Sequence, residues 1–252
     1  MSLLEALAVL GVGFFAGSIN TIVGSGSLVT FPTLLAIGYS PVVANVSNTV
    51  GLVFGSVSGA YGYRRELVGQ QRRLLVLGTG SLAGGLAGAL LLLTLPSSVF
   101  DDVVPVLILV ACALVVAQPR LSAMVTARRR KVVEHGGAVL WIAVLLTGVY
   151  GGYFGAAQGV ILLALLGIFI AEDLQRLNGV KNVLAAIANG VAAIVFVFAA
   201  NVAWEPALLL AVSSIAGAQL GASVGRRMPA PLLRTVIVVV GLIAAIKLLA
   251  DF

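Results

Sequence analysis

Hydrophobic residues occur along this chain in long stretches. A stretch of about 20 apolar residues is long enough to cross the hydrocarbon core of a bilayer as a helix. Such stretches are found at 41–62, 74–95, 102–118, 175–200, 206–225 and 232–250. Together with two interrupted stretches, they predict an all-α polytopic membrane protein with about eight to ten membrane helices.

The two interrupted stretches, 3–37 and 138–172, are too long for one straight span. Small and polar residues interrupt them at 18–27 and at 151–159. Each piece would contain about 16 residues and reach roughly 24 Å, which is less than a ~30 Å hydrocarbon core. We therefore expect short tilted helices or re-entrant hairpins. Their non-helical backbone must be buried in protein or line a cavity.

The order of features in residues 1–118 recurs in residues 138–252. The matched positions are Gly13 and Gly17 with Gly148 and Gly152, Asn48 with Asn182, Gly84 and Gly88 with Gly217 and Gly221, and Pro96 with Pro229. This order predicts two internal repeats, each beginning with a broken or re-entrant helix pair. The glycines at four-residue spacing are expected to pack helices closely.

Loop charges indicate how the two repeats are oriented. Lys and Arg concentrate in the loop 63–73, in the linker 119–137 and around 226–234, whereas the loops that hold Asp101 and Glu205 carry neither. Positively charged loops face the cytoplasm. Loop 63–73 is then inside, while its counterpart near 201–205 is outside, so the repeats must be inverted. We expect a basic cytoplasmic linker at 119–137 and both termini outside.

Composition excludes several classes of protein. Hydrophobic residues make up 60% of the chain and charged residues only 10%, whereas a soluble domain carries roughly 25% charged residues. An ordinary soluble enzyme, a disordered chain and a soluble nucleic-acid binder are therefore excluded. The net charge of +6 lies mostly in loops and indicates orientation in a bilayer, not binding to nucleic acid. We expect no removed signal peptide, because the first residues show no basic segment and no clear cleavage site.

Cofactor motifs are not expected in this sequence. One cysteine, Cys112, and one histidine, His135 in the basic linker, cannot form a disulfide or a thiolate metal cluster. A formal dinucleotide motif at 11–16 lacks the preceding strand and the acidic residue that such a site needs, and no nucleotide-binding P-loop motif is present. We expect neither a metal nor a cofactor.

Inverted repeats with broken helices are typical of secondary transporters, which hold their substrate near the midplane and move one bundle against the other. Two alternatives remain open. An intramembrane enzyme acting on a lipid-linked substrate would need an acid, His or Cys constellation within the spans. A non-transporting membrane scaffold would bind partners through the basic linker, and its intramembrane polar residues would serve only packing.

Polar side chains form a stripe on each of two spans that follow the interruptions. The first stripe contains Asn45, Asn48, Thr49 and Ser56, and the second contains Asn178, Lys181, Asn182 and Asn189. Polar groups inside a membrane are costly and usually face the bundle interior. The stripes are expected to converge on a shared cavity, although hydrogen bonding between helices is an alternative.

Lys181 is the most informative single residue, because its ammonium group could hold an anion inside the bilayer. Alternatively, it extends to the interface, where Glu172 and Asp173 precede its helix. Helix N-termini at the interruptions would add N–H groups that suit an anion. The candidate residues for binding a small anionic substrate are Asn20, Ser25, Ser27, Asn45, Asn48, Gln158, Asn178, Lys181 and Asn182.

Several segments resemble the TauE/SafE family of sulfite and organosulfonate permeases, also called the TSUP family. The resemblance is carried by 13–20 leading into 24–27, by 31–35 and 38–45, and in the second half by 148–159 and 176–182. It implies transport of a sulfur-containing anion such as sulfite or sulfoacetate across a bacterial cytoplasmic membrane. The glycine run of the family is interrupted here by Ser25 and Ser27, and in the second half by residues 156–158.

Overall fold

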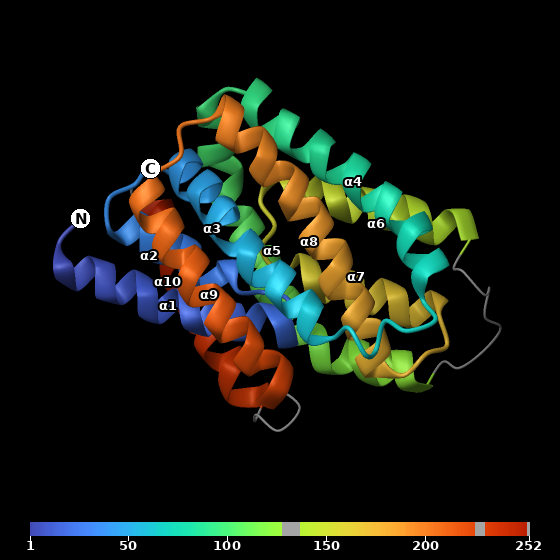
Figure 1. Cartoon of the computed structure of the whole chain (residues 1–252). Helices are drawn as coiled ribbons and strands as arrows, with labels where there is room; N and C mark the ends of the chain where they lie inside the picture. The colour runs from blue at the N-terminus through green and yellow to red at the C-terminus, as the bar shows by residue number, and fades with distance from the viewer. Residues whose placement is uncertain (128–136, 225–229, 251–252) are drawn as a thin grey trace.

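The computed structural model describes residues 1–127, 137–224 and 230–250. These residues form ten α-helices and no strand (Figure 1). The helices are α1 Leu3–Ile22, α2 Ser27–Ala36, α3 Pro41–Gly62, α4 Gln71–Thr94, α5 Ser97–Ala127, α6 Gly137–Tyr153, α7 Gln158–Phe169, α8 Leu174–Ala199, α9 Trp204–Val224 and α10 Ala230–Ala250.

Six of the described helices, α1, α3, α4, α5, α8 and α9, are long and apolar enough to cross a membrane. Large apolar side chains cover the outside of the bundle; Phe198, for example, is 86% exposed. Apolar surface on this scale fits a bilayer, because soluble monomers rarely expose large contiguous apolar patches. The prediction of an all-α polytopic membrane protein is confirmed.

The two interrupted stretches form helix pairs, α1 with α2 and α6 with α7. The breaks span residues 23–26 and 154–157, inside the segments expected from the sequence. Positive φ angles at Gly24 (88°) and Gly155 (79°) turn the chain at these points, which glycine does without steric cost.

The first break is shorter than expected. Ser18 and Asn20, expected at the interruption, lie within α1, which has 20 residues. The Ser18 hydroxyl donates to the carbonyl oxygen of Gly217 on α9 over 2.7 Å, and the carbonyl oxygen of Phe14 is its alternative acceptor at 3.2 Å. Because its hydroxyl is satisfied in this way, Ser18 does not end the helix.

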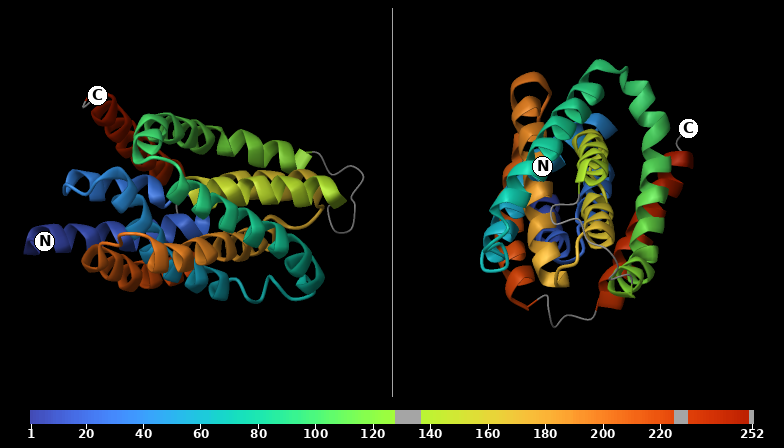
Figure 2. Two further views of the ribbon diagram at one scale, coloured as in Figure 1. Left: turned by 90° about the horizontal axis from the view of Figure 1, so that it is seen from above. Right: turned by 90° about the vertical axis from the view of Figure 1, so that its right-hand side faces the viewer.

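The start of α1 and the end of α10 lie at one end of the bundle, and the end of α5 and the start of α6 lie at the other (Figure 2). The loop 63–70 lies at this second end as well (Figure 1). Which end faces the cytoplasm stays a prediction. Residues 119–127, expected in the linker, continue α5. The expected linker positions Arg128–Lys131 and His135, and Arg226, Arg227 and Pro229, lie outside the described residues.

The two halves of the chain interlock. The most extensive helix contacts are α4 with α6 and α1 with α9, followed by α3 with α9 and α4 with α8. When α1–α5 are matched in order with α6–α10, the contact of α1 with α9 corresponds to that of α6 with α4. The contact of α3 with α9 corresponds in the same way to that of α8 with α4. This pairing is the one that two repeats related by a two-fold axis would produce. Their inverted orientation in a membrane stays a prediction.

The buried apolar side chains form two clusters. The larger one includes Phe31, Phe100 and Phe154, and the ring centroids of Phe31 and Phe154 are 5.3 Å apart in an edge-to-face arrangement. The smaller one packs α4, α6, α7 and α8 around residues such as Leu77 and Leu184. The larger cluster surrounds the two breaks and holds them at a defined position.

Glycines line the two main contacts between the halves. A Cβ atom at Gly17 would overlap the backbone of Ser214, and one at Gly217 would overlap the backbone of Phe14. Between α4 and α6 the same close approach occurs at Gly84, Gly88 and Gly152. Small residues at four-residue spacing therefore bring helix backbones into direct contact.

We expect Gly17→Ala to lower the free energy of unfolding by about 1–3 kcal/mol, because the added methyl group enters a packed seam. Gly11 is the matched control on the same helix, since a Cβ atom there would meet nothing within 4 Å. Gly11→Ala should be neutral or slightly stabilising. Thermal melting of both purified variants in detergent would measure the difference, and equal midpoints would contradict the packing role of the seam.

Candidate functional site

The two helix breaks meet inside the bundle. The backbone N–H of Gly159 donates to the carbonyl oxygen of Gly24 over 3.1 Å. A Cβ atom at either position would collide with the backbone of the other glycine. The chain needs glycine at both positions, because only without side chains do the two backbones approach this closely.

A small enclosed cavity lies beside this contact. It is lined by Asn20, Ser27, Thr49, Leu52, Phe154, Gly155, Gln158, Gly159, Ala185 and Asn189. Its volume is about 10 Å³, which is close to the space of a single water molecule. Three of the nine candidate residues from the sequence line it, namely Asn20, Ser27 and Gln158. Thr49 and Asn189 join them from the two polar stripes.

The lining of the cavity includes a buried hydrogen-bond donor without a partner. Asn20 donates through Nδ2 to the Ser56 hydroxyl over 3.1 Å, and Asn189 donates through Nδ2 to Oε1 of Gln158 over 3.4 Å. Gln158 is only 2% exposed, and its Nε2 has no hydrogen-bond partner in the described part of the chain. A buried donor without a partner costs about 1–3 kcal/mol. This amide nitrogen packs near Gly151 and keeps its hydrogen-bonding capacity unused.

Ser25 lies in the first break between Gly24 and Gly26. Its hydroxyl oxygen is buried and has no hydrogen-bond partner among the described residues. The first break thus holds a second buried polar atom whose hydrogen-bonding capacity is unused.

Lys181 is fully buried, with 0% of its surface exposed. Its Nζ donates to the carbonyl oxygens of Asn20, at 3.3 Å, and Thr21, at 3.1 Å. These carbonyls belong to the last turn of α1, where the backbone lacks helical partners and the helix dipole is negative. The ammonium therefore compensates the end of a helix that stops inside the protein.

Two amides from α8 support the same contact. Asn178 and Asn182 each donate through Nδ2 to the carbonyl oxygen of Thr21 over 3.3 Å. Asn178 also donates to the Tyr63 hydroxyl over 2.9 Å. Three predicted residues of the second stripe thus converge on the end of α1, next to the cavity and not on its lining.

The carboxylate at the start of α8 is engaged elsewhere. Glu172 pairs with Arg73 over 3.5 Å and with Arg176 over 2.9 Å. The structure shows no ion pair between Lys181 and a carboxylate in the ranges that it describes. Within the described residues, the hydrogen bonds of Lys181 Nζ thus go to backbone carbonyl oxygens of α1 and not to a carboxylate.

The first stripe serves the end of α6 in the same way. Asn45 on α3 donates through Nδ2 to the carbonyl oxygen of Tyr153 over 2.9 Å, and Asn48 accepts a hydrogen bond from the Thr30 hydroxyl of α2. Each broken helix thus ends against the long polar helix of the opposite half. Only α8 brings a charge to this contact, so the positive potential lies on one side of the cavity.

Sequence reasoning did not identify Thr21, Thr30 or Tyr63 as parts of this region. Thr21 contributes its backbone oxygen, which leaves no signal in the pattern of side chains. Tyr63 lies directly after α3, beside the basic loop, where an aromatic residue gives little indication of burial. Thr30 lies within an apolar stretch and was not considered, although a polar residue inside a membrane span indicates a position that faces the protein interior.

The chemistry available at the breaks is hydrogen-bond donation beside a positive charge. Amide and hydroxyl groups line the cavity, α7 begins at Gln158, and Lys181 lies close by through its bonds to α1. Over the described residues, no group of three His, Cys, Asp or Glu side chains lies close enough together to hold a metal ion. The arrangement suits a small anion.

Comparisons with known proteins agree over nearly the whole chain. A family model described as sulfite exporter TauE/SafE matches residues 9–248. The probable membrane transporter protein YfcA of Escherichia coli (strain K12) is 29% identical over 247 residues, which cover 96% of this chain and 90% of the relative. The probable membrane transporter protein ORF9 of Sinorhizobium sp is 27% identical over 248 residues, which cover 94% of this chain and 90% of the relative.

A further relative, a probable membrane transporter protein of Haemophilus influenzae, is 25% identical over 249 residues, which cover 98% of this chain and 96% of the relative. No solved structure matches this chain with significance.

Proposed function

Because this chain belongs to the sulfite exporter TauE/SafE family, it is a multi-pass membrane transporter and not an enzyme, and we propose that its substrate is sulfite or an organosulfonate such as sulfoacetate. In this proposal the substrate binds where the two helix breaks meet. Transport proceeds by alternating access, with the two halves as inverted repeats.

The observation that carries the proposal is the contact between the breaks, with an unused donor on one side and a buried ammonium nearby. A sulfonate or sulfite offers several oxygen acceptors on a compact group. Gln158 Nε2, the Ser25 and Ser27 hydroxyls and the amide of Asn20 would donate to these oxygens. Hydrogen bonds to charged groups are stronger than neutral ones.

Lys181 supplies the compensating charge in this proposal. An anion in the cavity would compete with the carbonyl oxygens of Asn20 and Thr21 for its ammonium group. Asn178 and Asn182 would keep the Thr21 carbonyl bonded while Lys181 turns to the substrate. Asn45 and Asn48 would hold the opposite side of the site through the end of α6 and through α2.

Substrate entry requires movement, because the cavity of about 10 Å³ has room for little more than one water molecule. The glycine seams pack α1 on α9 and α4 on α6 through backbone contacts, so each seam would move as a rigid unit. The breaks at 23–26 and 154–157 would then act as hinges between these units.

We expect purified protein in proteoliposomes to carry radiolabelled sulfite or sulfoacetate, and Gln158→Leu to reduce that flux at least about tenfold, because it removes the unused donor. Gln71→Leu is the matched control, since Gln71 is exposed at the start of α4. Wild-type flux in the Gln158 variant would remove this residue from the site. Absence of flux for any small anion would contradict the transporter mechanism proposed for this cavity.

Lys181→Met tests the role of the charge. We expect at least about tenfold weaker binding of sulfite or sulfoacetate, because hydrogen bonds from charged groups contribute about 1.5–3 kcal/mol. Asn182→Leu is the matched control, since it also removes a donor to Thr21 but no charge. Ligand-induced thermal shifts would compare the variants. Equal losses in both would indicate that Lys181 serves only to hold α1.

The proposed topology places the basic linker in the cytoplasm and both termini outside, in the cytoplasmic membrane of a bacterium. The separation of the termini from the end of α5 supports this arrangement (Figure 2). Reporter fusions at residue 125 and at the C-terminus should therefore report opposite sides, with residue 125 inside. Reports from the same side would contradict the inverted arrangement.

A further inference from the structure

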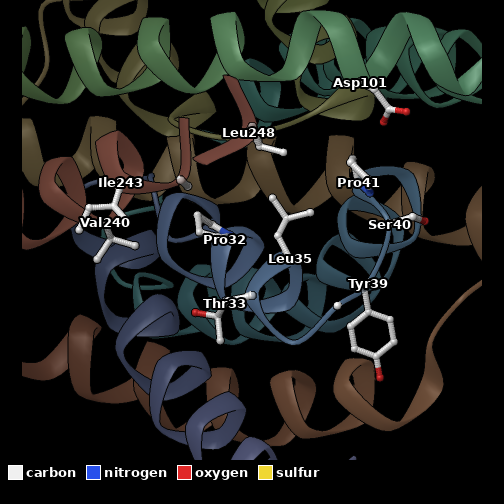
Figure 3. A pocket seen from close by; sticks show the side chains of 13 residues that line it. Pro32, Thr33, Leu35, Tyr39, Ser40, Pro41, Asp101, Val240, Ile243 and Leu248 are labelled. Atoms are coloured by element: carbon white, nitrogen blue, oxygen red, sulfur yellow. The ribbon is translucent and has the colours of Figure 1, made fainter. Parts of the chain in front are cut away.

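A second, much larger cavity lies at the end of the bundle where α1 begins. Its volume is about 730 Å³. Its walls come from α2, from α5, from α10 and from the loop that connects α2 to α3 (Figure 3). It is separate from the cavity at the breaks, with which it shares no lining residue. Nothing in the proposed transport step uses it.

The lining of this cavity is divided by polarity. Asp101, Ser40 and Tyr39 lie at one end, and Val240 and Ile243 lie at the other (Figure 3). The stretch of α10 from Val240 to Leu248 that lines it is roughly 12 Å long at 1.5 Å per residue. The cavity therefore matches an amphiphilic ligand, because it has a polar end and an elongated apolar part.

The apolar end is continuous with the outer surface of the bundle. Ile243 lines the cavity and is 62% exposed, and the neighbouring Ile246 and Leu242 on α10 are exposed as well. In a membrane this surface contacts acyl chains. A lipid can therefore enter the cavity laterally from the bilayer. This route favours a lipid over a water-soluble ligand, whose apolar part would be too short to fill the apolar end.

The polar end is acidic. Oδ1 of Asp101 is buried and has no hydrogen-bond partner in the described part of the chain. Asp102 follows it directly, and the described lining contains no Lys or Arg. A buried carboxylate oxygen without a donor is costly, and it favours a ligand that brings a positive charge and N–H groups. A headgroup that carries only negative charge is disfavoured at this end, whereas a zwitterion can place its ammonium group beside the carboxylate.

We propose that this cavity binds a phospholipid with a primary-amine headgroup of the phosphatidylethanolamine type. The ammonium donates to Oδ1 of Asp101, and an acyl chain lies between α2 and α10 along Leu35, Ile243 and Leu248. The site affects the transport cavity through α2, because this short helix contributes Pro32 and Leu35 to the lipid cavity and Ser27 to the cavity at the breaks. The proposal does not depend on the identity of the transported substrate.

The full chain would be reconstituted with equal amounts of phosphatidylethanolamine and phosphatidylglycerol, extracted in mild detergent and analysed by native mass spectrometry. We expect the wild type to retain the amine lipid over phosphatidylglycerol by about tenfold, since one charge-assisted hydrogen bond distinguishes the two. Asp101→Asn should abolish this preference. Asp102→Asn, which changes the exposed neighbour, should keep it.

Ala36→Phe provides a second variant that does not touch the carboxylate. Ala36 lines the cavity and is exposed on α2, so the larger side chain should occupy the space and reduce retention of the amine lipid without preventing folding. Equal retention of both lipids by the wild type would overturn the proposal. An unchanged preference in Asp101→Asn, or retention of phosphatidylcholine at the level of the amine lipid, would overturn it as well.

Discussion

The structure depends on one constraint: a helix that ends inside a bilayer must find partners for its free backbone carbonyl groups. The first broken helix ends at Ile22 and the second at Tyr153. Each end is satisfied only in part within its own half, where the carbonyl oxygens of Ile19 and Tyr150 accept bonds from the residues of the break. The carbonyls of the first receive Lys181, Asn178 and Asn182 from α8, and a carbonyl of the second receives Asn45 from α3.

This constraint links packing and function. Exchanging partners between the halves brings the two breaks together, so that Gly159 bonds to Gly24 and a polar cavity remains beside them. The long seams of α1 with α9 and α4 with α6 hold each broken helix firmly along most of its length. The breaks themselves are buried in the larger apolar cluster, so the movement that we propose for transport would have to repack the side chains around them.

Much of the fold was predictable because membrane insertion leaves strong patterns in a sequence. Span positions follow from hydrophobic length, and both breaks fall within the segments expected from their Gly and Ser content. Burial of Asn45, Asn48, Asn178 and Asn182 follows from the cost of polar groups in lipid. The partners of Lys181 did not follow, because its acceptors are backbone oxygens of a helix about 160 residues away. Ser18 was placed at a break for the related reason that its acceptor on α9 could not be seen.

The sequence by itself determined the class of molecule, the spans, the two interruptions and the set of polar residues that had to avoid lipid. These properties depend on the composition of local segments, which the bilayer selects directly. Only the tertiary structure decided which polar residues would hold helix ends and which would remain free, as Gln158 and Ser25 do. That division depends on hydrogen bonds between distant segments, whose geometry is set by the way the two halves interlock.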